Sequence, residues 1–99
     1  MTEKPLFIPL KTEYYDAFAS GKKTIERRKY GAGWNEQTCR VGRRVTLSKG
    51  YGKQNRLYGT IKAFYVSAAA AKSDEWIAVY GPGEAVAACI GIELDEVMQ

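Results

Sequence analysis

The sequence contains no histidine, and this absence removes several kinds of catalysis at once. Histidine general acid–base catalysis, Ser-His-Asp triads and histidine-ligated zinc sites are all excluded. Any catalysis would have to use lysine, arginine, carboxylate, hydroxyl or thiol groups. We therefore expect a site that holds no metal ion and needs no cofactor.

Cysteine is also scarce, because Cys39 and Cys89 are the only two. Nothing else in the sequence suggests secretion, so reduced thiols are expected rather than a disulfide. Cys89 lies in an apolar segment and is expected to be a small buried side chain.

Long apolar runs are missing as well. No run approaches the roughly 20 residues that a membrane-spanning helix needs. The segment from Met1 to Pro5 lacks the apolar stretch of a signal peptide. The sequence therefore predicts a cytoplasmic protein that does not contact a membrane.

The composition that is present fits one globular domain spanning residues 1–99. Hydrophobic residues make up 45% and charged residues 26%, values that argue against disorder. The formal net charge of +4 favours a phosphate-rich partner, although ordinary solubility explains it equally well.

Several short strands with helices between them are expected along the chain. A helix over residues 12–20 is predicted from its aromatic spacing, with Thr12 as N-cap and Gly21 just after its end. Ser67 and Ser73 are candidate caps of two further helical segments. Strand patterns cover residues 6–10, 24–30, 45–48, 57–66 and 86–94. The predicted fold class is α+β, a small, partly open β-barrel with short helical caps.

Residues 21–28, with the sequence Gly-Lys-Lys-Thr-Ile-Glu-Arg-Arg, are the main candidate site. In a strand, Glu26 and Arg28 share one face, and Ile25 points the other way, toward the core. A carboxylate can hold an arginine in an orientation that meets a phosphate, and a clustered lysine can serve as base or nucleophile. A solvated basic edge strand has the same composition, so both interpretations stay open.

The same residues resemble a known family. Gly21, Lys23, Glu26 and Arg28 match the Gly-x-Lys-x-x-Glu-x-Arg signature of the ASCH domain. Similar segments surround the motif, at residues 6–20, 41–47, 59–61 and 88–94. The resemblance implies a PUA-like β-barrel with short helices capping a cleft, and binding of RNA, single-stranded in our prediction, beside the motif. Some members of the family resemble ribonucleases that need no metal.

A second similarity points to a different chemistry. Lys23-Thr24-Ile25 followed by Arg28 fits the Lys-Thr-Ile-x-x-Arg pattern of very small bacterial relatives that hydrolyse the acetyl amide of acetylcytidine. That group uses a lysine, a threonine and a glutamate. Its threonine falls three residues after the lysine, where this chain has Glu26. The chain also has Gly42-Arg43 where the family commonly has Gly-Asp.

Three functions are therefore expected as alternatives. In a ribonuclease, Lys23 would act as base or charge stabiliser, and Arg28, held by Glu26, would neutralise the transition state. In an amidohydrolase, Lys23 would attack the acetyl carbonyl, with Glu75 or Glu26 carrying protons and Thr24 nearby. A regulator that binds a modified base without turnover is the third alternative. A helix-start charge effect explains Glu75 more simply.

Other basic and aromatic residues are candidates for nucleic-acid contact. Aromatic rings and cations interleave at Tyr51, Lys53, Arg56 and Tyr58, a mixture that suits single-stranded RNA or a plain hairpin with exposed tyrosines. Trp34 could stack on a base or cover one end of the barrel. The remaining candidates for phosphate contact are Lys22, Arg27, Arg43 and Arg44.

Overall fold

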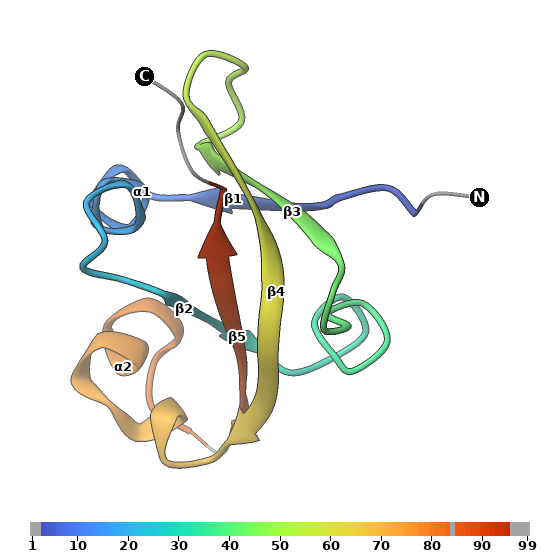
Figure 1. Cartoon of the computed structure of the whole chain (residues 1–99). Coiled ribbons are helices and arrows are strands. Elements are labelled where there is room, and N and C mark those ends of the chain that lie inside the picture. Colours follow the sequence, from blue (N-terminus) through green and yellow to red (C-terminus); the bar gives the residue numbers. More distant parts are fainter. Residues whose placement is uncertain (1–2, 84, 96–99) are drawn as a thin grey trace.

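The computed structural model describes residues 3–83 and 85–95. Within these residues, one five-stranded sheet curls into a half-barrel, with helices α1 and α2 on one side of the view (Figure 1). The small mixed α+β fold confirms the predicted class. None of the helices in the described ranges has the length and apolar character to cross a membrane. The elements are β1 (Leu6–Leu10), α1 (Thr12–Ala19), β2 (Ile25–Lys29), β3 (Arg44–Lys49), β4 (Arg56–Ser67), the 3-10 helix η1 (Ala70–Lys72), α2 (Asp74–Tyr80) and β5 (Ala87–Leu94).

The helix caps follow local chemistry. Ser73 caps α2 as predicted, since its Oγ accepts a hydrogen bond from the amide of Trp76 at 3.2 Å. Thr12, however, is not the N-cap of α1. Lys11 holds that place with an extended backbone, and its carbonyl accepts from the amides of Tyr14 and Tyr15. Gly21 follows the end of α1 with a positive φ of 83°, a conformation that glycine adopts without strain.

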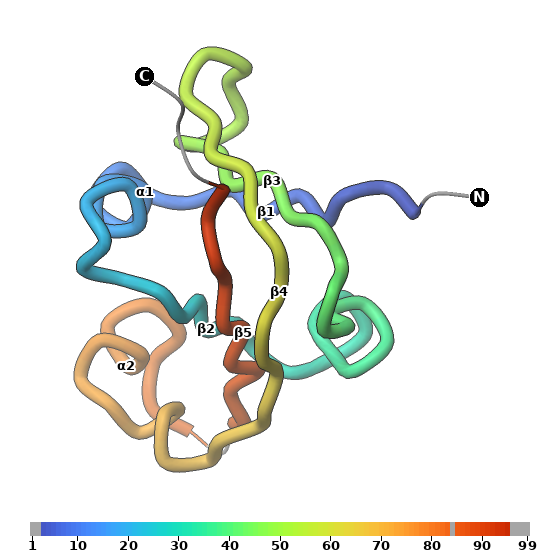
Figure 2. Tube along the Cα trace, in the orientation of Figure 1, coloured from blue at the N-terminus to red at the C-terminus, as the bar shows by residue number. Residues whose placement is uncertain are grey.

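The strand order is β1-β3-β4-β5-β2, so β1 and β2 form the two edges of the sheet. β1 pairs in parallel with β3, and the other neighbours are antiparallel. The register of β4 and β5 shifts between Ile61 and Ala63, and such a bulge increases local twist. The chain passes from β2 through the loop of residues 30–43 to reach β3 (Figure 2).

Two apolar clusters lie on opposite faces of β5. Ile90 and Ile92 belong to the main core with residues of β1, α1, β3 and β4. Cys89 and Ala87 join Trp76 of α2 in a smaller cluster. The Ile25 side chain was predicted to point toward the core, and it packs against this smaller cluster rather than the main core. Both cysteines are buried free thiols, which agrees with the sequence.

Candidate functional site

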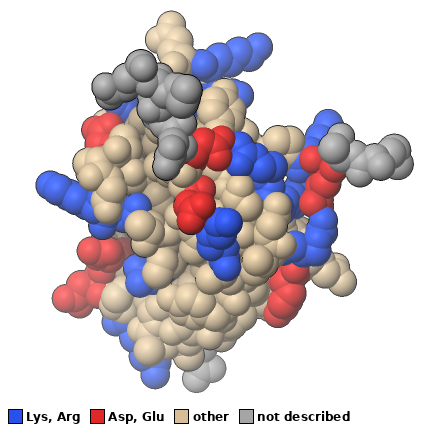
Figure 3. All heavy atoms as spheres, viewed as in Figure 1, with Lys and Arg blue, Asp and Glu red and all other residues tan. Residues whose placement is uncertain are grey.

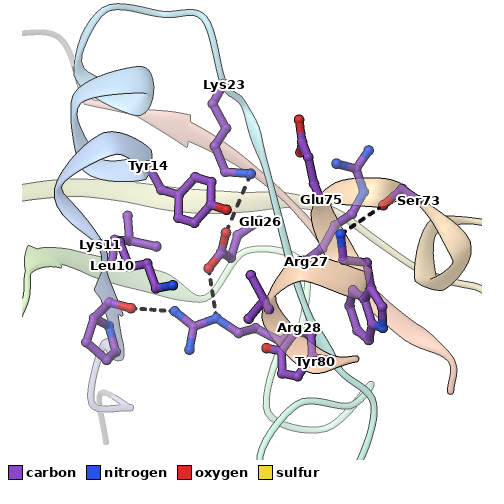
Figure 4. A pocket seen from close by; sticks show the side chains of 13 residues that line it. Leu10, Lys11, Tyr14, Lys23, Glu26, Arg27, Arg28, Ser73, Glu75 and Tyr80 are labelled. Atoms are coloured by element: carbon purple, nitrogen blue, oxygen red, sulfur yellow. Dashed lines mark hydrogen bonds and ion pairs between the residues drawn. The ribbon is translucent and has the colours of Figure 1, made fainter. Parts of the chain in front are cut away.

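A pocket of about 230 Å³ opens where edge strand β2 lies between helices α1 and α2 (Figure 4). Because β2 has no strand beyond it, side chains from both of its faces reach the pocket. Five residues named from the sequence line it: Lys23, Glu26, Arg27, Arg28 and Glu75. Apolar and aromatic side chains of α1, β1 and α2, together with Lys11 and Ser73, supply the rest of the wall.

Glu26 is the buried charge of this pocket, only 6% exposed. Its Oε2 accepts a hydrogen bond from Nε of Arg28 at 2.8 Å, and its Oε1 lies 3.6 Å from Nζ of Lys23. A buried carboxylate is costly unless it is paired and hydrogen-bonded. The two cations therefore make the burial of Glu26 tolerable and fix its orientation.

Arg28 has further partners besides Glu26. Its Nη2 donates to the main-chain carbonyl of Pro9 at 2.5 Å, and its guanidinium carbon lies 4.8 Å from the ring centre of Trp34. Trp34 also packs against the main core as a partly buried side chain. The guanidinium of Arg28 is thus held on several sides, which makes it a positioning group.

Lys23 reaches the same carboxylate across aromatic rings. Its Nζ lies 5.4 Å from the ring centre of Tyr14 and 5.7 Å from that of Phe18. Both distances are within the range of cation–π attraction. The side chain is 18% exposed, so the ammonium group is restrained but still accessible from the pocket.

Tyr14 adds a hydroxyl group to the pocket, beside Lys23 and Glu26 (Figure 4). Burial raises the pKa of Tyr14 above its ordinary value, and the negative charges of Glu13, Glu75 and Glu26 raise it further. Tyr14 therefore keeps its proton well into the basic range and can donate a hydrogen bond to a ligand.

Arg27 and Glu75 lie at the rim that the pocket shares with a shallower neighbouring depression. Lys22 and Thr24 line that depression but not the main pocket. Arg27 is exposed, and no carboxylate of residues 3–83 or 85–95 forms an ion pair with it. An incoming ligand can therefore meet Arg27 without displacing an internal partner, and the same holds for Lys11, which lines the pocket, is exposed and has no ion pair within residues 3–83 and 85–95.

Arg43 and Arg44 are not brought to the pocket. Arg43 donates to the carbonyls of Thr38 at 2.6 Å and Lys4 at 3.0 Å. Arg44 pairs with Asp95, and this hydrogen bond lowers the pKa of the Asp95 carboxyl. Both guanidinium groups thus connect separate segments of the chain.

The remaining candidates lie at the β3–β4 hairpin, at the opposite end of the view from α2 (Figure 1). Tyr51 is 82% exposed and Tyr58 is 53% exposed. Lys53 and Arg56 are in the same hairpin. These four residues form a surface separate from the pocket.

Sequence reasoning missed several residues that complete the pocket. Tyr14 and Tyr80 contribute aromatic walls, and Val79 and Pro9 contribute apolar ones. The rings of Trp76 and Tyr80 lie 4.4 Å apart, a contact that their four-residue spacing on a helix could have indicated. No comparable pattern marks Pro9 or Val79.

Charge on the rest of the surface is mixed. Basic and acidic side chains are intermingled on the face seen in Figure 3. Two ion pairs, Arg44 with Asp95 and Lys62 with Glu93, illustrate this mixing. In the described part of the chain, no three cysteine or acidic side chains are grouped as metal ligands would be.

No protein-family model matches the chain, and no curated protein sequence matches it.

Proposed function

We propose that this chain is an RNA-binding domain of the ASCH type, with a PUA-like barrel, whose pocket takes one unstacked nucleotide of single-stranded RNA. One observation carries the proposal: the three charged positions of the motif, Lys23, Glu26 and Arg28, meet in one pocket. A basic edge strand that only protected its edge would leave these side chains apart in solvent.

The walls of the pocket suit a nucleobase. Tyr14 and Tyr80 offer aromatic surfaces on two sides, and proteins commonly bind unstacked bases of RNA against such rings. Arg27 at the rim and Lys23 deeper in the pocket are placed to meet a phosphate. A shallow basic rim beside an aromatic pocket therefore supports a bound nucleotide of a longer strand.

Cleavage of the bound RNA is the catalytic form of this proposal. Lys23 first passes its ammonium proton to Glu26, and its neutral amine then takes the proton of the ribose 2′-hydroxyl while the 2′-oxygen attacks the adjacent phosphorus. The bond from phosphorus to the 5′-oxygen breaks, and that oxygen takes a proton from Tyr14 or water. The products are a 2′,3′-cyclic phosphate and a 5′-hydroxyl end. Arg27, rather than the internally bonded Arg28, faces the charge that develops on the phosphate oxygens.

Fluorescence anisotropy with labelled single-stranded RNA of about 12 nucleotides tests the binding. Affinity is expected to fall as salt rises, because cations that meet phosphates release counterions. Lys23→Ala is expected to weaken binding, whereas Lys62→Ala, which removes a surface lysine paired with Glu93, leaves it unchanged. Electrophoresis of the same RNA detects cleavage. Absence of binding, or equal affinity of Lys23→Ala and the wild type, rejects the proposal.

A second candidate is hydrolysis of the acetyl amide of acetylcytidine. The observation that favours it is that Lys23, Glu26 and Glu75 line one pocket together with Tyr14. Lys23 first passes its ammonium proton to Glu26, its neutral Nζ attacks the acetyl carbon, and the bond from that carbon to the exocyclic nitrogen of the base breaks. Glu75 or Glu26 passes a proton to the leaving nitrogen, and water then releases acetate from the lysine.

Mass spectrometry after incubation with acetylcytidine separates the two candidates. Release of cytidine that is lost in Lys23→Ala supports the amidohydrolase. If neither cytidine nor cleaved RNA is formed while RNA binds tightly, the chain is a non-catalytic binding protein.

A further inference from the structure

A row of side chains crosses three strands on the outer face of the sheet. Phe7 of β1 is in register with Thr46 of β3, and Thr46 is in register with Tyr58 of β4. Residues paired in register point to the same side of a sheet. Phe7 is 37% exposed and Tyr58 is 53% exposed, so two aromatic rings are accessible on this face.

The β3–β4 hairpin adds a third ring and two cations to this row. The ring centre of Tyr51 lies 6.3 Å from that of Phe7. The guanidinium carbon of Arg56 lies 5.3 Å from the Phe7 ring centre, and the buried Nε of Arg56 has no hydrogen-bond partner among residues 3–83 and 85–95. Lys53 is exposed at the hairpin. We call Phe7, Tyr51, Lys53, Arg56 and Tyr58 the hairpin surface.

The charges of the hairpin surface are not neutralised from within. In residues 3–83 and 85–95, neither Lys53 nor Arg56 forms an ion pair, unlike Arg40, Arg43 and Arg44 in the preceding loop and strand. Exposed rings beside unpaired cations are complementary to single-stranded nucleic acid, because bases stack on rings while phosphates meet cations. The surface around Tyr65 and Val66 is also exposed, but its lysine, Lys62, is paired with Glu93.

We propose that the hairpin surface is a second contact for the same RNA strand that enters the pocket. Tyr51, Phe7 and Tyr58 stack on bases there, and Lys53 and Arg56 meet phosphates. This inference rests on the proposed RNA binding and extends it. Strand β1 connects the two regions, since Pro9 lines the pocket and Phe7 lies two residues earlier, about 7 Å along the strand.

The experiment compares RNA of about 4 and about 12 nucleotides, lengths within the range that one small barrel covers. The double variant Tyr51→Ala with Tyr58→Ala removes two stacking rings and is expected to bind the longer RNA at least about 30-fold more weakly than the wild type. Its affinity for the shorter RNA stays within about twofold. The matched control, Tyr51→Phe with Tyr58→Phe, keeps the rings and is expected to bind both RNAs as the wild type does. Because both tyrosines are more than half exposed, the variants are expected to fold, which thermal melting checks.

Each outcome separates this inference from the function on which it rests. If the double alanine variant binds the longer RNA like the wild type while Lys23→Ala binds weakly, the hairpin surface is not a contact and the pocket function stands. If the alanine variant is weakened but Lys23→Ala is not, RNA binds the hairpin surface without the pocket. Absence of RNA binding by the wild type overturns both.

Discussion

Arg28 on one edge of the sheet donates a hydrogen bond to the main-chain carbonyl of Pro9 on the opposite edge. The two edge strands, β2 and β1, are not paired through their backbones. A side chain of the motif therefore closes the half-barrel at the pocket. The same guanidinium group holds Glu26, so the shape of the pocket and the position of its buried charge depend on one residue.

Arg28→Lys is expected to lower the free energy of unfolding by about 1–3 kcal/mol. A lysine has one amino group and no planar face, so it cannot bond Glu26 and Pro9 while also stacking on Trp34. Chemical denaturation measures the change. Arg27→Lys is the control on the same strand, and it is expected to change stability by less than about 0.5 kcal/mol because Arg27 is exposed. Equal stability of the two variants contradicts the closing role of Arg28.

Glu26→Gln is expected to destabilise the fold by about 1–3 kcal/mol. The amide keeps the shape of the side chain but removes the charge that pairs with Lys23 and Arg28. Glu93→Gln, which removes a carboxylate that is 70% exposed, is expected to cost less than about 0.5 kcal/mol. Chemical denaturation of both variants measures these changes in the free energy of unfolding. If Glu26→Gln lowers the free energy of unfolding no more than Glu93→Gln does, the buried ion pairs contribute little to stability.

Much of the secondary structure could be predicted from local pattern. The helix after Lys11, the cap at Ser73 and the last strand each depend on neighbouring residues in the sequence. The order of strands could not be predicted, because the parallel pairing of β1 with β3 joins segments that are far apart in the chain.

The candidate site could be predicted only as a motif. Lys23, Glu26 and Arg28 are visible as a charged cluster, but alternation alone favours an exposed face for Glu26. Its burial depends on ion pairs that form after the strand is folded. Arg28 was expected to face a phosphate, and no sequence pattern relates it to Pro9 or Trp34.

Gly59→Ala is expected to destabilise the fold by about 1–3 kcal/mol, which denaturation can measure. A Cβ at position 59 would lie 2.5 Å from the carbonyl oxygen of Glu93, where backbone must move. The matched variant Gly91→Ala places its Cβ 3.2 Å from the methyl group of Ala63, a contact that a small shift relieves. Gly91→Ala is therefore expected to cost less than Gly59→Ala. The reverse order would show that β4 and β5 are farther apart near Gly59.

The Tyr30–Glu36 contact gives a prediction about pH. The Tyr30 hydroxyl donates to both carboxylate oxygens of Glu36, at 2.7 and 2.6 Å, and this lowers the pKa of Glu36 and raises that of Tyr30. Any stability from Glu36 is present above its ordinary pKa of 4.5 and lost as the pH falls through the lower folded value. Any stability from Tyr30 is present below its ordinary pKa of 10.0 and is lost as the pH rises through its higher pKa in the folded protein.

Tyr30→Phe is therefore expected to return the pKa of Glu36 toward 4.5, as measured by NMR titration of its side chain. The pKa of Asp95, which Arg44 lowers, serves as the internal control and stays unchanged. If the pKa of Glu36 is the same in both proteins, the hydroxyl is not its main partner.

Arg27→Ala is expected to flatten the salt dependence of RNA affinity. Each phosphate contact with single-stranded nucleic acid contributes roughly −0.7 to the slope of log affinity against log salt. Arg27 lies at the pocket rim without an ion pair in the described residues, so its removal is expected to reduce the slope by about that amount. Arg40→Ala removes an arginine that is paired with Glu3 and bonded to the Gln37 carbonyl, and it is expected to leave the slope unchanged. Since both variants lose the same charge from the molecule, a slope that falls equally in the two indicates a general effect of net charge, and a slope that falls only for Arg27→Ala indicates a phosphate at the pocket.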